Sequence, residues 1–82
     1  MLSKRVDSSV IQSIGYDEQR HLLKVRFHSG RTYYYLDVAP SAHRALLAAP
    51  SIGGYFNEVI KPAHRAVRER DLRSITRSRA RR

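Results

Sequence analysis

Hydrophobic and polar positions alternate most clearly between residues 22 and 27. Apolar side chains share one side of an extended chain there and cationic side chains share the other: Leu23, Val25 and Phe27 against Lys24 and Arg26. This period of two is typical of a strand with one buried face. The pattern therefore predicts a half-buried strand whose outer face is basic.

Two further strands are expected on either side of this one. Residues 9–14 mix β-branched and small polar side chains and are followed by Gly15-Tyr16-Asp17, a cluster typical of a turn. Residues 31–36 are dense in the aromatic and β-branched types that suit a pleated surface. Three consecutive strands of this kind predict an antiparallel meander.

The loop between the second and third strands decides which tyrosines face the core, because a register shift of one residue turns every side chain to the other face. A three-residue loop over residues 28–30, with Gly30 in the left-handed region, suits the order His-Ser-Gly better than a two-residue loop. It predicts the pairs Phe27 with Arg31, Val25 with Tyr33 and Leu23 with Tyr35. Tyr33 and Tyr35 then share the core face, and Tyr34 lies on the opposite face beside Lys24 and Arg26.

Two short helices are predicted after the strands. Pro40 suits the first turn of a helix that Pro50 stops. Ser51 can cap a second helix, which Pro62 ends or kinks. The apolar stripe of this second helix comprises Ile52, Tyr55, Phe56, Val59 and Ile60. Its spacing predicts a helix face that covers one side of the sheet.

Charge is unevenly distributed along the chain. Residues 61–82 hold nine of the sixteen basic residues and two acids, a net charge of +7, whereas the other sixty residues hold seven basic and five acidic residues, a net charge of +2. Residues 63–75 could form a helix with a patchy apolar stripe, which would place Arg70, Arg73 and Arg77 along one face. The asymmetry favours a polyanionic partner, since each cation that neutralises a phosphate releases counterions.

Several short motifs follow one another in a characteristic order. They are Val6-x-Ser8-Ser9, Ile14-Gly15-Tyr16-Asp17, Phe27-His28-Ser29-Gly30, Tyr33-x-Tyr35 and Ser51-x-Gly53-x-Tyr55-Phe56-Asn57 followed by Ile60. Together they resemble the KTSC domain, a short module named for its occurrence at the C-terminus of some lysyl-tRNA synthetases. The match covers roughly Val6 to His64, with His43 and His64 where tyrosine is expected in relatives. The resemblance implies a compact domain for which RNA binding has been suggested, with no cofactor or catalytic residues to carry over.

Other chemistries are weakly supported by the sequence. The chain has no cysteine and its four histidines lack the spacing of a zinc site, so neither a metal nor a cofactor is expected. No serine lies in a nucleophile elbow, and Gly53-Gly54 lacks a nucleotide-binding pattern. No apolar run is long enough to span a membrane, and the absence of cysteine fits a reducing compartment. We therefore expect a cytoplasmic protein that is not an enzyme.

The sequence thus predicts an α+β fold: a three-stranded antiparallel meander with two short helices on one face in residues 6–62, and a basic, partly helical extension in residues 63–82. The expected function is nucleic-acid binding, with RNA favoured over DNA, through the phosphate backbone. The alternative is a protein-interaction adaptor that docks through the exposed sheet face or an edge strand. The candidate binding residues are Lys24, Arg26, Tyr34, Lys61, Arg65, Arg68, Arg70, Arg73, Arg77, Arg79, Arg81 and Arg82.

Overall fold

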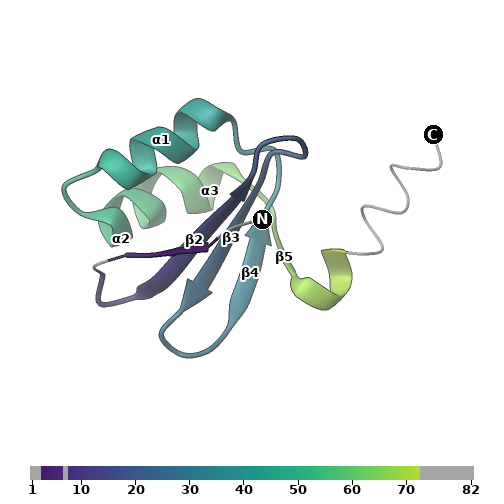
Figure 1. Cartoon of the computed structure of the whole chain (residues 1–82), viewed down its shortest axis with the longest axis horizontal. Helices are drawn as coiled ribbons and strands as arrows, with labels where there is room; N and C mark the ends of the chain where they lie inside the picture. Colours follow the sequence, from purple (N-terminus) through teal and green to yellow (C-terminus); the bar gives the residue numbers. More distant parts are fainter. Residues whose placement is uncertain (1–2, 7, 73–82) are drawn as a thin grey trace.

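The structure is a computed structural model that describes residues 3–6 and 8–72. It has an α+β fold in which an antiparallel sheet carries helices on one face (Figure 1). Over the described residues the strands lie side by side in chain order: β1 (Ser3–Arg5), β2 (Ile11–Asp17), β3 (Leu22–Phe27), β4 (Thr32–Tyr35) and β5 (Ala66–Arg68). The predicted meander forms the centre, and the two short outer strands were not predicted.

The hairpin of β3 and β4 has the predicted register. Leu23 pairs with Tyr35 and Val25 with Tyr33. The N–H of Phe27 donates to the carbonyl of Arg31 at 2.9 Å, and Gly30 has a φ of 97°. The three-residue loop with a left-handed glycine is therefore confirmed, and with it the assignment of side chains to the two faces of the sheet.

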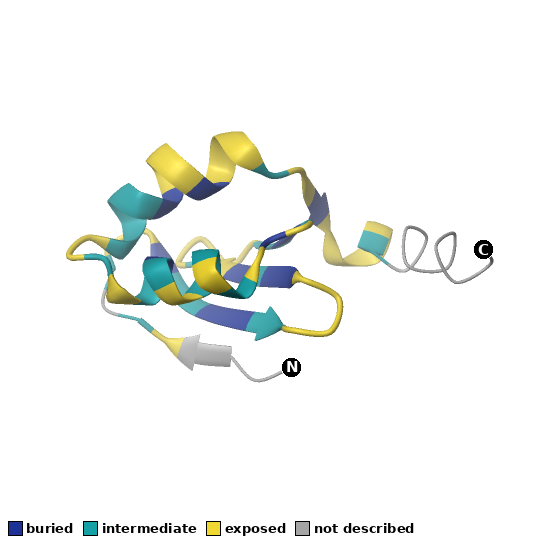
Figure 2. Cartoon of the chain, turned by 90° about the horizontal axis from the view of Figure 1, so that it is seen from above, coloured by how far each residue is buried: buried dark blue, intermediate teal, exposed yellow. Residues whose placement is uncertain are grey.

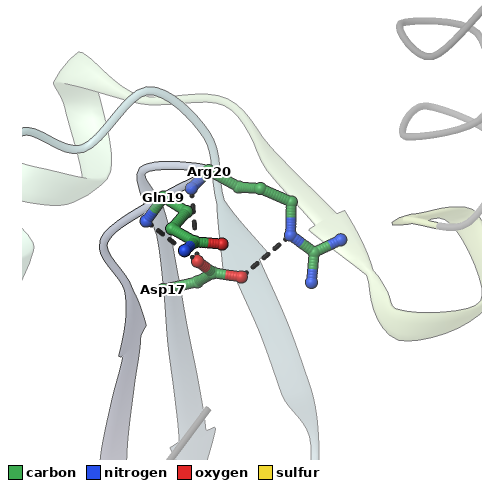
Figure 3. Close-up of polar contacts among 3 residues, drawn as sticks. All are labelled: Asp17, Gln19 and Arg20. Carbon is green, nitrogen blue, oxygen red and sulfur yellow. Dashed lines mark hydrogen bonds and ion pairs between the residues drawn. The ribbon is translucent and has the colours of Figure 1, made fainter.

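The predicted turn at Gly15-Tyr16-Asp17 is wrong, because β2 continues through all three residues. Gly15 pairs with Lys24, and the hydroxyl of Tyr16 donates to the carbonyl of Val38 across to the helix layer. The chain reverses at residues 18–21 instead. There the carboxylate of Asp17 accepts from the backbone N–H groups of the two residues that Figure 3 shows beside it, Gln19 and Arg20.

The two predicted helices are present with one modification. α1 (Pro40–Ala48) starts at its proline. In the second helix, α2 (Ile52–Tyr55) runs through a π-helical turn, η1 (Phe56–Ile60), into α3 (Lys61–Ala63). The hydroxyl of Ser51 caps this helix by accepting from the N–H of Gly54 at 3.1 Å. The wider π turn has more residues per turn than the α-helical spacing assumes, and Val59 is 44% exposed instead of packing with the predicted stripe.

The core lies between the helices and one face of the sheet, as the buried segments in Figure 2 show. The side chains of Leu23, Val25 and Tyr35 from the sheet meet Leu46, Phe56 and Ile60 from the helices. The rings of Tyr35 and Phe56 meet edge to face at 5.1 Å. The prediction that the helices cover the face carrying Tyr35 is confirmed.

The predicted helix over residues 63–75 is wrong in its first part. Residues 66–68 form β5, which pairs with β4 so that Val67 lies opposite Tyr34. The N–H of Leu36 donates to the carbonyl of Arg65 at 3.0 Å and begins this pairing. Pairing with the open edge of β4 buries the Val67 side chain, which a solvated helix with a patchy apolar stripe would leave largely exposed. After β5 the described chain is helical at residues 69–72.

Candidate nucleic-acid interface

The sheet face opposite the helices, here called the outer face, carries cations among small polar residues. The register places one row of side chains across four strands: Arg5, Ser13, Arg26 and Thr32. Arg5 and Arg26 are exposed. They are separated by one strand, so their backbones are about 10 Å apart, twice the usual interstrand spacing. Because Ser13 between them is short, neither guanidinium is shielded by a bulky neighbour.

The next row continues this surface. Lys24 lies between Gly15 on β2 and Tyr34 on β4. Its side chain is half-buried, as expected when a long alkyl stem lies along the sheet and the ammonium group reaches solvent. The predicted grouping of Lys24, Arg26 and Tyr34 on one face is therefore confirmed.

The expectation that the Tyr34 ring is exposed is wrong. Tyr34 is 7% exposed, and Leu22 and Val67 on the same face are also buried. These three residues are buried but are not part of the main core, and they are here called the outer cluster. Burial raises the pKa of Tyr34, and the nearby Glu69 carboxylate raises it further. A buried ring cannot stack on a base, so Tyr34 supports the sheet instead.

A turn at one end of the outer face holds an ion pair. The Nε atom of Arg20 lies 2.8 Å from Oδ2 of Asp17 (Figure 3). This hydrogen bond is the main reason that the pKa of Asp17 is lowered. The Arg20 guanidinium also lies near enough to Tyr34 to oppose the rise in its pKa. Asp17 therefore does not leave an uncompensated negative charge beside the basic rows.

The predicted helix over residues 63–75 would have brought Arg65, Arg68 and Arg70 together, but these three residues lie in different segments. Lys61 is on α3 in the helix layer, Arg65 is in the connection, Arg68 ends β5, and Arg70 is in the helical turn that follows. All four side chains are exposed. The remaining predicted residues lie outside the described residues: Arg73, Arg77, Arg79, Arg81 and Arg82.

Two exposed arginines were missed by the sequence analysis. Arg5 joins the outer face only because β1 pairs with β2. Arg31 precedes β4 and lines a groove of about 310 Å³ together with Thr32, Tyr33 and Arg68. A signal for Arg31 was present, since the predicted hairpin register already placed it on the same face as Tyr33, two residues away.

A second groove, of about 370 Å³, lies between β2 and α1. The rings of Tyr16 and His43 are stacked there, with centroids 4.4 Å apart and planes 12° apart. Burial lowers the pKa of His43, the Arg44 guanidinium lowers it further, and Glu18 opposes both effects. The groove combines one acidic and one basic side chain, so it has no strong preference for a charged ligand.

Metal and membrane sites were also considered. Residues 3–6 and 8–72 contain no group of three histidine, aspartate or glutamate side chains placed to hold a metal ion. In the same part of the chain no helix is both long and apolar enough to cross a membrane.

Comparison with known proteins places the chain in a family. Residues 7–64 match the sequence profile of the KTSC domain. An uncharacterized protein of Stutzerimonas stutzeri is 48% identical over 63 residues, which cover 74% of this chain and 89% of that protein. A lysine–tRNA ligase of Nostoc punctiforme is 40% identical over 55 residues, which cover 67% of this chain and 10% of the ligase.

A solved structure agrees with this assignment. The crystal structure of a KTSC domain protein from Yersinia pestis superposes with a TM-score of 0.79 at 37% identity, covering 82% of this chain and 94% of that protein. The matched residues, 7–64, include the central strands and both helices but end before β5. The chain therefore belongs to the KTSC domain family.

Proposed function

We propose that this protein is a non-enzymatic module that binds nucleic acid through its phosphate backbone. The observation that carries the proposal is the position of its charge. Arg5, Lys24 and Arg26 lie on the outer face of the sheet, and β5, which is part of the +7 segment, forms the edge of that sheet. The helix layer covers the other face, so these three cations and the apolar core occupy opposite sides.

The mechanism is electrostatic capture. Each guanidinium presents a planar set of donors that fits phosphate oxygens, and each phosphate contact releases a condensed counterion. Contacts of this kind read the backbone rather than base edges. The protein should therefore bind with modest sequence preference and with strong dependence on salt.

RNA is favoured over DNA by one of the relatives. A domain 40% identical to this chain occupies about a tenth of a protein named as a lysine–tRNA ligase. The name of that ligase includes tRNA, and this supports RNA over DNA as the ligand of this chain. We infer that single-stranded or looped RNA is the preferred ligand, because such RNA offers accessible phosphates and unstacked bases.

The proposal is tested by fluorescence anisotropy with a labelled single-stranded RNA, a DNA duplex and an acidic protein, each titrated from 50 to 200 mM salt. With about eight phosphate contacts, RNA affinity should fall by roughly 10³ to 10⁵ over this range. Deleting residues 73–82, which leaves β5 in place, should remove most of the affinity and flatten the salt dependence. Equal RNA binding by the intact and shortened chains would contradict the assigned role of the extension.

A pair of charge substitutions tests the outer face separately. Lys24→Gln with Arg26→Gln removes two cations from this face. Arg44→Gln removes one cation from the helix layer and is the control; it is compared with Arg26→Gln alone, because these two single variants lower the net charge equally. We expect the first pair to reduce the salt slope by about 1.4 at two lost single-strand contacts, and the control to leave it nearly unchanged. An equal fall in the salt slope for both sets of variants would show that RNA binding depends only on the total charge of the protein.

A protein-binding adaptor is the second candidate. Its support is the edge strand β5, whose outer side is unpaired over residues 66–68 in the described sheet. An extended acidic segment could add a strand there. In the salt titration this alternative predicts tighter binding to the acidic protein than to RNA.

A further inference from the structure

The groove beside β5 has a lining that the backbone-binding role does not explain. Its four residues come from the start of β4 and the end of β5: Arg31, Thr32, Tyr33 and Arg68. A phosphate needs only cations. This groove instead combines two guanidinium groups and an aromatic ring from the helix-covered face of the sheet, with Thr32 of the opposite face at its edge, in about 310 Å³, near the lower end of the volumes of small-molecule sites.

Strand pairing fixes how these groups lie relative to one another. Tyr33 pairs directly with Arg68 on the neighbouring strand. Arg31 precedes Tyr33 by two residues, so the side chains of Arg31, Tyr33 and Arg68 start from the same face. The two arginines therefore flank one aromatic ring, and the groove is built on backbone hydrogen bonds rather than on a loop alone.

Neighbouring rings hold Tyr33 in place. Phe27 meets Tyr33 edge to face at 6.1 Å and 69°. Phe27 in turn meets the buried Phe56 at 5.8 Å. Tyr33 remains half-buried, unlike Tyr35, which is 4% exposed. Its ring is thus anchored by the core on one side and lines the groove on the other.

The charge of the two arginines is not neutralised within the described residues. The ion pair formed there is that of Arg20 with Asp17, and no carboxylate of the described residues forms an ion pair with Arg31 or Arg68. Two exposed guanidinium groups at one groove favour a dianionic or multiply hydrogen-bonded ligand, and phosphate meets both conditions. An adjacent aromatic ring favours a ligand that also has a flat π face.

We propose that this groove binds one nucleotide unit, with the phosphate between Arg31 and Arg68 and the base against the ring of Tyr33. The inference rests on the proposed function, because the unit would belong to a bound RNA strand. It deepens that function by assigning one position along the strand to a base contact. An acidic peptide could satisfy the arginines but would leave the ring without a stacking partner.

The direct test is an NMR titration of the intact ¹⁵N-labelled protein with uridine 5′-monophosphate, inorganic phosphate, uridine and a glutamate-rich peptide. The nucleotide should shift the amide signals of Arg31, Thr32, Tyr33 and Arg68 and should bind more tightly than phosphate or uridine alone. Equal binding of phosphate and nucleotide overturns the base contact. Shifts at these amides that are larger with the peptide than with the nucleotide overturn the proposal in favour of a protein ligand.

A pair of variants connects the groove to RNA. Arg31→Gln with Arg68→Gln should weaken binding of single-stranded RNA about tenfold and lower the salt slope by about 1.4, whereas the control Arg44→Gln, which matches Arg31→Gln alone in net charge, should leave both unchanged. Both arginines are exposed, so the thermal unfolding midpoint should be unchanged.

The two proposals fail differently. If the groove variant and the intact chain bind RNA equally, the groove assignment is wrong although RNA binding stands. If the nucleotide shifts the groove amides but no RNA binds, the proposed function is wrong although the groove is a ligand site.

Discussion

The two faces of the sheet are built from the same strands but have opposite characters. The helix-covered face contributes fully buried residues such as Leu23 and Val25 to a core completed by Leu46, Phe56 and Ile60. The outer face has an apolar cluster of only three residues and is otherwise polar and basic. Stability is therefore concentrated on one side, and charge can accumulate on the other with little cost to folding.

This division follows from the period of two along each strand. In β3 the alternation that buries Leu23 and Val25 also places Lys24 and Arg26 toward solvent. A short chain buries a limited fraction of its surface, so one well-packed side must provide most of the folding free energy.

Removing an aromatic ring from the helix-covered face should have the largest effect. Phe56 is 2% exposed and contacts the rings of Phe27 and Tyr35. Phe56→Ala should lower the free energy of unfolding by about 3–5 kcal/mol through lost burial and a cavity. Urea denaturation followed by circular dichroism measures this change. A loss below about 1 kcal/mol would mean that the core does not carry the stability assigned to it.

Removing a side chain from the outer cluster should lower the free energy of unfolding less than removing one from the main core. Val67 is 7% exposed and lies opposite Tyr34. Val67→Ala should cost about 1–2 kcal/mol, the value for two buried methyl groups. The matched control is Val59→Ala, since Val59 is 44% exposed and its truncation should change stability by less than about 0.5 kcal/mol. Equal effects in the same denaturation experiment would show that β5 is not packed on the sheet.

A substitution that strains the loop between β3 and β4 should lower the free energy of unfolding by about 1 kcal/mol. Gly30 has a φ of 97°, and a methyl group added there would meet no atom within 4 Å. Gly30→Ala should therefore destabilise the hairpin through backbone strain alone, by about 1 kcal/mol. Ser29→Ala, at an exposed position in the same loop, is the control. If both variants unfold at the same urea concentration, the left-handed conformation is not required.

The smallest effect should be a pH dependence of stability that arises from His43 on the helix-covered face. Burial lowers the pKa of His43 below its usual value of 6.5, so the unfolded chain binds protons more readily than the folded protein. The resulting stability is present above pH 6.5 and is lost as the pH falls through the folded pKa. Denaturation midpoints between pH 5 and 7.5 should fall on acidification, and His43→Phe should reduce that slope. An unchanged slope in the variant would exclude His43 as its source.

Local patterns predicted the centre of the fold because each signal there was strong. The alternation of residues 22–27 and the left-handed Gly30 determined the hairpin register. The end of β2 was mispredicted because Gly15-Tyr16-Asp17 has turn-forming composition. In the structure the hydroxyl of Tyr16 donates a hydrogen bond to the carbonyl of Val38, which holds Tyr16 in the strand. β5 was missed because its three residues gain their partners only from β4, which lies about thirty residues earlier in the chain.

The candidate site, like the fold, was predictable where it depends on local strand alternation and not where it depends on the pairing of β4 with β5. Lys24 and Arg26 follow from strand alternation, so their common face was found. The burial of Tyr34 depends on β5, and the groove of Arg31 and Arg68 depends on the same pairing. A single long-range strand pairing thus explains both the error at Tyr34 and the groove that the sequence did not reveal.

The strand β5 also influences how copies of this protein behave toward each other. A fragment that ends at residue 64, where the family match ends, would leave the edge of β4 open beside its tyrosines. An open edge of this kind templates pairing with another chain and promotes aggregation. In the intact protein the edge is three residues long and is flanked by Arg65 and Arg70, whose like charges repel a second copy. We therefore expect a chain shortened to residue 64 to self-associate more readily than the intact protein.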